Sequence, residues 1–156
     1  MRKTCLLLLL LPIAIGCGDD AGEPIEGTIM MQYGDKMPAM VAGSAVQHEE
    51  NDDMLVQVGS RAVDCGTYLD RFLDFDAPNG HFVHFAVPKV PGTYDSHSVS
   101  VDRNSSRESY SYSSTGDVVI DSVDEMRVTG SVSFMVTDDE EGEIAVSGTF
   151  DVLRCF

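Results

Sequence analysis

Four histidines and many serines are the residues of this chain that could carry out nucleophilic catalysis. That chemistry needs a Ser or Cys beside a His whose ring is oriented by a carboxylate. The sequence contains no G-x-S-x-G turn, and its V-A-G-S-A-V segment falls within a predicted strand. The sequence therefore predicts no catalytic residue and no enzyme. The alternative is an exported hydrolase built on one of the histidines, which are His48, His81, His84 and His97.

Metal ligands are also poorly spaced. His81 and His84 are three residues apart, which on a strand places them on opposite faces of the sheet. The calcium candidates are Asp74, Asp76 and Asn79, in the turn D-F-D-A-P-N-G. This turn lacks the alternating spacing and the distant Glu of a loop that supplies about six to eight oxygens to calcium. We therefore expect neither a metal site nor a cofactor.

Two further sets of side chains could bind ligands. Tyr110 and Tyr112 share one face of a predicted strand, as a carbohydrate platform would require, although packing at a sheet edge explains the pair more simply. Methionines near the start of the domain could hold a soft metal ion, but filling irregular gaps in the core is the simpler explanation. These methionines are Met30, Met31, Met37 and Met40.

The cysteines divide by position. Cys5 and Cys17 belong to the opening segment, which leaves Cys65 and Cys155, 90 residues apart. In an exported protein such a remaining pair predicts a disulfide. By the chain-entropy relation, a bridge of this span would stabilise the fold by about 4–5 kcal/mol. The alternatives are a metal-binding pair, for which further ligands at suitable spacing are missing, and two free thiols.

The opening of the chain has the layout of an export signal. Arg2 and Lys3 precede an apolar stretch over 5–15, which contains Pro12 and is too short to cross a bilayer as a helix. We expect residues 1–16 to be a signal peptide that is removed on export. The acidic sequence G-D-D-A-G-E-P that follows predicts a flexible tether.

The boundary Ala14-Ile15-Gly16-Cys17 resembles the lipobox of bacterial lipoproteins, although Ala14 stands where that pattern prefers Leu. The resemblance implies cleavage before Cys17 and acylation of Cys17, so membrane lipid is the expected partner. Two or more chains anchor a protein stably, because each buried CH₂ contributes about 0.8 kcal/mol. Gly18 at the following position favours the outer membrane. An ordinary cleaved signal with an incidental Cys is the alternative.

The chain is strongly acidic, with a formal net charge of −16. Loss of Arg2 and Lys3 with the signal would make the charge still more negative. Such a charge repels phosphates and anionic headgroups, which argues against nucleic acid and against peripheral membrane binding. A well-solvated surface is the simplest explanation of the acidity. About 140 residues remain after the signal, which suits one domain.

Period-two alternation of apolar and polar residues predicts β-strands. It is clearest in M-R-V-T-G-S-V-S-F-M-V and E-I-A-V-S-G-T-F-D-V-L-R-C, which the acidic turn D-D-E-E-G connects. We expect these two strands to form a hairpin with Phe134 opposite Gly148 and Val132 opposite Phe150. An aromatic ring would then cover a glycine, filling the gap left by the missing side chain.

Seven more strands are predicted between turns rich in Gly, Pro, Asn and Asp. They cover 25–33, 40–48, 54–59, 81–87, 93–101, 109–113 and 117–123. One short helix is expected near 67–73, where Leu69, Phe72 and Leu73 have helical spacing. The fold class is therefore all-β, an antiparallel β-sandwich or small β-barrel of about eight or nine strands. It forms a single domain over 27–156, with the lipidated Cys and tether over 17–26.

The lipobox, P-G-T-Y at 91–94, G-D-V-V-I at 116–120 and the paired V-x-G-x-[VF] strands together resemble small predicted lipoproteins of Gram-negative bacteria. The resemblance implies an exported β-rich domain on a lipid anchor and carries over no catalytic residue. We therefore expect a non-enzymatic, membrane-anchored envelope lipoprotein with a binding or structural role. Its partner would be an envelope protein or a small ligand. A calycin-like carrier, with a cavity lined by inward Phe, Met and Val, is an alternative.

Overall fold

A computed structural model describes residues 24–48, 51–66, 80–95, 99–103, 110–112, 114–138 and 142–156. Several predicted features lie outside these residues: the lipobox with Cys17, the helix expected near 67–73, the calcium candidates Asp74, Asp76 and Asn79, and His97. The side chains of Tyr110 and Tyr112 are likewise not described. None of the described residues forms a helix that could cross a bilayer.

All regular structure in the described residues is β-strand, which confirms the all-β prediction. The strands are β1 (Glu26–Gly27), β2 (Met30–Tyr33), β3 (Ala42–Gln47), β4 (Met54–Gly59), β5 (His81–Val87), β6 (Gly92–Asp95), β7 (Val99–Arg103), β8 (Tyr110–Tyr112), β9 (Ser114–Val123), β10 (Arg127–Asp138) and β11 (Gly142–Arg154). The bounds of β4 and β5 are those predicted from the sequence.

Two predicted strands are each divided in two. The segment 25–33 is interrupted at Thr28 and Ile29, whose amides both donate to the Thr149 carbonyl, at 2.9 and 3.0 Å. The register with β11 is the same before and after the interruption. The segment 93–101 forms β6, which pairs with β9, and β7, which pairs with β5. The chain therefore changes partners between these two strands, which a pattern of alternation does not reveal.

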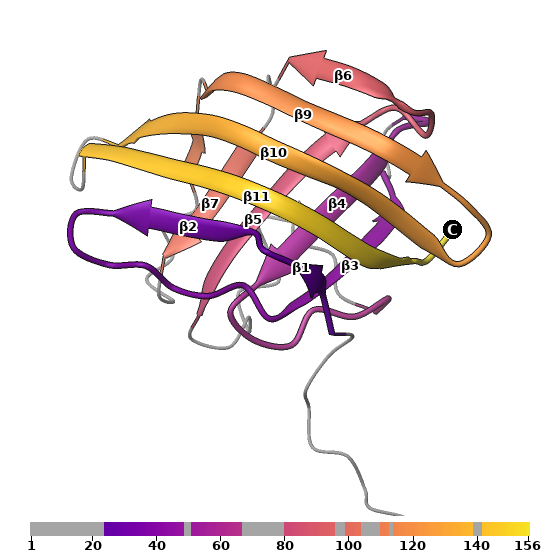
Figure 1. Cartoon of the computed structure of the whole chain (residues 1–156), viewed down its shortest axis with the longest axis horizontal. Helices are drawn as coiled ribbons and strands as arrows, with labels where there is room; N and C mark the ends of the chain where they lie inside the picture. Colours follow the sequence, from indigo (N-terminus) through magenta and orange to yellow (C-terminus); the bar gives the residue numbers. More distant parts are fainter. Residues whose placement is uncertain are drawn as a thin grey trace, which may run out of the picture.

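The strands form one curled sheet in the order β6-β9-β10-β11-β3-β4-β5-β7-β8, and β1 and β2 also pair with β11. Figure 1 shows the sheet folded over itself, with β9, β10, β11 and β2 running across β3, β4, β5 and β7. Every pair is antiparallel except β11–β3, which is parallel at Leu153↔Ser44 and Arg154↔Ala45. The sheet is therefore mixed, and the prediction of an antiparallel sheet is wrong at this junction.

The β10–β11 hairpin differs from the predicted register by two residues. Phe134 lies opposite Val146, and Val132 lies opposite Gly148. The last pair of the hairpin is Asp138↔Gly142, so only three residues connect the two strands. This short connection determines the register. Because the shift is two residues, every side chain keeps its predicted face. The expected cover of a glycine by an aromatic ring is present, but it is Phe150 that lies opposite Gly130.

The core lies between the two layers. Phe85 of β5 meets Phe134 and Phe150 edge to face, with ring centroids 6.4 and 5.7 Å apart. Met31 and Met40 are buried in the same cluster, as expected of methionines that fill gaps. Met30 and Met37 are instead 44% and 57% exposed, so the four methionines do not gather at one point.

A disulfide joins Cys65 to Cys155, with Cα atoms 5.4 Å apart, and agrees with the pairing expected from the sequence. Hydrogen bonds hold the chain on both sides of the disulfide beside β3. The Cys155 amide donates to the Ala45 carbonyl at 2.8 Å, and the Ser44 side chain donates through Oγ to the Asp64 carbonyl at 3.0 Å. The bridge therefore secures the parallel junction between β11 and β3.

Candidate functional site

His84 lies on the side of β5 that faces away from the main core, and its side chain is buried. The cross-strand register places it opposite Gln57, which is opposite Ser44. Gln57 Nε2 donates to Ser44 Oγ at 2.9 Å, and that hydroxyl donates its proton to the Asp64 carbonyl. The hydroxyl of Ser44 is thus engaged as donor and acceptor, which makes it a poor nucleophile.

Burial and, to a smaller extent, the neighbouring His48 together lower the pKa of His84 to about 4. The imidazole is therefore neutral at pH 7, because the charged form would lose its hydration in the interior. A general base works best with a pKa near the operating pH, so this histidine would be a weak one.

His81 is paired with a phenol. Tyr33 Oη and His81 Nε2 are 2.5 Å apart, and the ring centroids are 5.7 Å apart. Lys36 Nζ lies 4.9 Å from the centre of the Tyr33 ring. The pair joins β2 to β5 and hence one layer to the other. No local sequence pattern indicates this pair, since the two positions are 48 residues apart.

Among the residues that the structure describes, no three His, Cys, Asp or Glu side chains gather where they could hold a metal ion. Of the hydrolase candidates within the described residues, His48 and His84 are buried near each other and His81 is paired with Tyr33, and none of these three lines the surface hollow described below.

Outward side chains from the middle of β10 and β11, together with those of β2, form a patch that we call the outer face. Cross-strand pairs build it: Ser133 lies opposite Ser147, and Met135 lies opposite Ala145. On the other side of β11, Gln32 is paired with Ala145, and Met30 with Ser147. The members are Met30, Gln32, Ser131, Ser133, Met135, Ala145, Ser147 and Thr149. They point outward because the alternate residues of the same strands fill the core.

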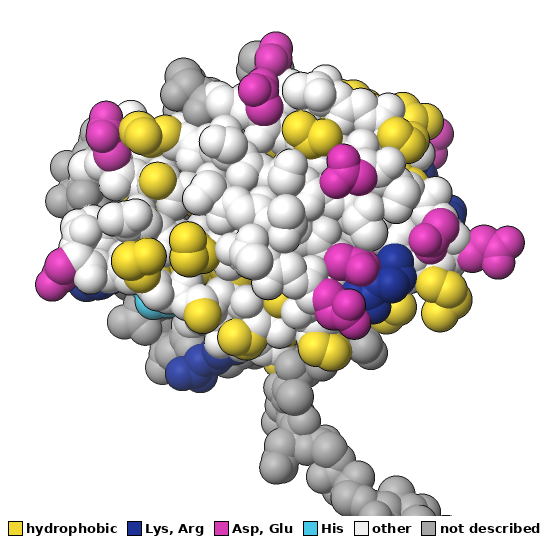
Figure 2. Space-filling model, viewed as in Figure 1, with side chains coloured by type: hydrophobic (Ala, Val, Ile, Leu, Met, Phe, Trp, Pro, Cys, Tyr) yellow, Lys and Arg dark blue, Asp and Glu magenta, His cyan; other side chains and the backbone are white. Residues whose placement is uncertain are grey.

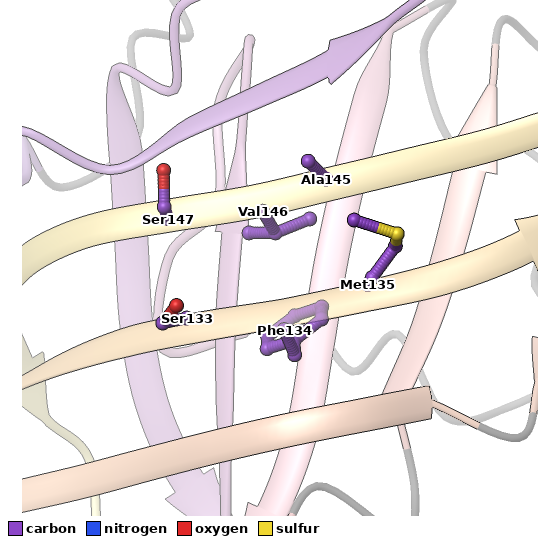
Figure 3. A pocket seen from close by; sticks show the side chains of 6 residues that line it. All are labelled: Ser133, Phe134, Met135, Ala145, Val146 and Ser147. Carbon is purple, nitrogen blue, oxygen red and sulfur yellow. The ribbon is translucent and has the colours of Figure 1, made fainter.

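A shallow hollow of about 280 Å³ lies in this face (Figure 3). Its lining consists of Ser133, Phe134, Met135, Ala145, Val146 and Ser147. Figure 3 shows the two serines at one end and Met135 with Ala145 at the other. Small side chains at 133, 145 and 147 leave space beside the long thioether of Met135, which is 40% exposed.

No charged or titratable side chain lines the hollow. In Figure 2 the left and centre of this side carry few acidic or basic side chains, whereas an acidic side chain and a group of acidic and basic side chains lie to the right of the centre. The nearest acidic positions are Asp117, opposite Ser133 on β9, and two residues of β11: Glu143, two positions before Ala145, and Asp151, two positions after Thr149. In a chain of net charge −16, this is a distinctly neutral surface.

The chemistry of the outer face is that of neutral recognition. Hydroxyl groups both donate and accept hydrogen bonds, and the thioether offers a soft apolar contact. The face holds no acid, base or nucleophile activated by a neighbour. Sequence reasoning missed it because the alternation was used to identify the inward residues, although the outward residues of the same strands were equally available.

Comparison with known proteins adds no relative: no family model, no curated protein and no solved structure matches the chain.

Proposed function

We propose that this chain is a non-enzymatic lipoprotein of the bacterial envelope, anchored through acylated Cys17, whose domain binds a neutral partner through the outer face. The outer membrane is the expected location. The partner is an envelope protein with an uncharged contact surface, and nucleic acid is not expected.

The anchor is supported by the sequence around Cys17. A positively charged start, a short apolar stretch and a lipobox-like end occur in the order that export and lipidation require. Pro24, the first described residue, follows Cys17 by seven positions. A domain that begins so soon after the lipidated residue would stay close to the membrane.

The observation that carries the binding role is the neutral outer face of an acidic protein. Acidic side chains keep a protein soluble and repel other acidic molecules. A patch without them lacks this repulsion and is therefore the more favourable surface for contact with another protein. The hollow is open and shallow, whereas sites for small ligands are concave and bury most of the ligand. An extended protein surface therefore fits the outer face better than a small molecule does.

The rival functions lack such support. A calycin-like carrier needs an apolar cavity between its layers, where Phe85, Phe134 and Phe150 pack against one another. A hydrolase needs a Ser–His pair in a cleft. The His81 ring is hydrogen-bonded to a phenol. His84 lies opposite Gln57, which separates it from Ser44, and the proton of Ser44 is donated to the Asp64 carbonyl.

Two measurements test the proposal on the full-length chain expressed in a Gram-negative host. The first is the intact mass of the mature protein, with Cys17→Ser as the control. We expect a chain that begins at Cys17 and carries acyl groups, and neither feature in the variant. A wild-type mass without acyl groups would overturn the anchor.

The second measurement is site-specific photo-crosslinking. A photoreactive amino acid at Ser147 should give a discrete crosslinked protein, which the same amino acid at Glu125, an exposed turn position, should not give. Ala145→Asp should abolish the product, because a carboxylate would then occupy the neutral hollow. Equal crosslinking from both positions, or a product that survives Ala145→Asp, would overturn the binding role of the outer face.

A further inference from the structure

The connection between β2 and β3 carries an exposed apolar segment, residues 36–41, that we call the ribbon. Met37 and Val41 are 57% and 51% exposed, and Ala39 is exposed between them. Met40 points the other way and is buried in the core. Bridges from Tyr33 to Lys36 and from Met30 to Ala39 hold the ribbon against β2. Its apolar side chains are therefore presented to solvent by a fixed backbone.

The ribbon lies beside the point where the described chain begins. The Ile25 amide donates to the Val41 carbonyl at 3.2 Å, and Pro24 forms a bridge with Ala42. The Val41 amide in turn donates to the Gly59 carbonyl at 2.8 Å. In Figure 1 the ribbon runs along the lower border of the molecule, next to β1.

The distance from this border to the lipid is limited by the sequence. Six residues, 18–23, lie between an acylated Cys17 and Pro24, so the two are seven residue steps apart. At about 3.4 Å per residue, even a fully extended chain reaches only about 24 Å. The ribbon is thus held close to the bilayer surface, where a contact of low intrinsic affinity forms readily because it is intramolecular.

Charge favours the same orientation. A chain of net charge −16 is repelled by anionic headgroups, so the least acidic border turns towards them most easily. The ribbon itself contains no Asp or Glu, and its charged residue is Lys36. Arg61, which is exposed two residues after Gly59, adds to Lys36, whereas Asp35 opposes them. Figure 2 shows hydrophobic and basic side chains along this lower border.

We propose that the ribbon is a membrane-contact surface, and that Met37 and Val41 enter the headgroup layer when Cys17 is acylated. The inference rests on the proposed lipid anchor. The contact fixes the orientation of the domain, because the ribbon faces the lipid while the turn of β9 and β10 and the outer strand β10 point elsewhere. Strands β11 and β2 lie between β10 and the ribbon.

The oxidation rates of the protein's own methionines test the proposed membrane contact. Full-length acylated protein is reconstituted in vesicles of phosphatidylethanolamine and phosphatidylglycerol and treated with hydrogen peroxide, and peptide mass spectrometry gives the oxidation rate at each methionine. Met126 and Met135, 64% and 40% exposed, are the internal references. We expect the rate at Met37, relative to both references, to be at least about threefold lower than in unacylated protein whose chain begins at Cys17.

The Val41→Asp variant of the acylated protein should restore the relative rate at Met37 to that of the unacylated protein. Position 41 is exposed, so the fold should persist, which circular dichroism checks. An unchanged Met37 rate in protein whose mass shows acyl groups would overturn the membrane contact and leave the anchor standing. A mass without acyl groups would overturn both proposals.

Discussion

The ring of Phe150 covers Gly130, its partner across the β10–β11 hairpin, so closely that no side chain fits between them. A Cβ atom at position 130 would lie 2.7 Å from Phe150 Cζ, and closer still to the carbonyl oxygen of Val119 on β9. Phe150 in turn packs against Phe85 of the opposite layer. A glycine on one strand therefore determines where the aromatic core of both layers lies.

Gly130→Ala should destabilise the protein, because the added methyl group must displace either the ring or the β9 backbone. We expect a loss of about 2–3 kcal/mol in the free energy of unfolding, the cost of overpacking a core. Urea denaturation followed by circular dichroism measures it. Gly66→Ala is the control, since its Cβ would meet only the Asp64 side chain, at 3.3 Å. Equal losses in the two variants would contradict this account.

The disulfide should account for a large part of the stability. Replacing Cys65 and Cys155 together with serine should lower the free energy of unfolding by about 4 kcal/mol, because the unfolded chain gains the freedom of a 90-residue loop. Denaturation of the wild-type protein with a reductant should give a similar loss, whereas the double variant should not respond to the reductant. A wild-type midpoint that ignores the reductant would contradict the prediction.

Stability should fall as the pH falls from about 6.5 towards 4. The pKa of His84 is about 4 in the folded protein and 6.5 as its ordinary value, so the unfolded chain binds more protons in this range. The full stability is present above pH 6.5 and is lost progressively below it, by up to about 3 kcal/mol at pH 4. Thermal denaturation between pH 7.5 and 5 measures the slope.

His84→Gln is the matched variant for this pH dependence, because it keeps a polar side chain without a titratable ring. Its melting temperature should depend less on pH between 7.5 and 5 than that of the wild-type protein. The range above pH 5 is chosen because carboxylates begin to titrate below it. Identical slopes for the two proteins would show that His84 is not the group responsible.

Tyr33→Phe should cost about 1–2 kcal/mol, because it removes the phenol that pairs with His81 and leaves a ring nitrogen with one partner fewer. Tyr94→Phe is the control: the Tyr94 hydroxyl donates to the Val90 carbonyl at an exposed site, at 2.7 Å, where water can replace it. Chemical denaturation of both variants gives the comparison. A larger loss from Tyr94→Phe would contradict the view that the Tyr33–His81 pair joins the layers.

Alternation was sufficient to predict β10 and β11, which bury every second side chain. The bounds of β4 and β5, which are buried almost throughout, were predictable from the turn residues on either side of them. The register of the hairpin was not predictable from alternation, since a shift of two residues preserves both faces. The length of the turn decided it. The partner change between β6 and β7 and the parallel junction of β11 with β3 depend on long-range packing, which leaves no local pattern.

The outer face illustrates the same limit in a different way. Its serines and methionines were visible in the sequence. That Ser147 belongs to a neutral patch follows only from its neighbours Ser133 and Met30, which lie on other strands. The absence of charge is a property of the assembled surface. The expectations for Cys17 and for residues 67–79, which lie outside the described residues, remain predictions.

The position of β11 has a consequence for the order in which the fold is acquired. Strand β11 pairs with β1, β2, β3 and β10. These four strands are synthesised earlier, and their pairing is incomplete until β11 has been synthesised. Contacts between segments so distant in sequence make folding slow, because the chain must close long loops before they can form. A chain that crosses a membrane from its N-terminus onwards would therefore remain unfolded until β11 arrives, which is the state that translocation requires.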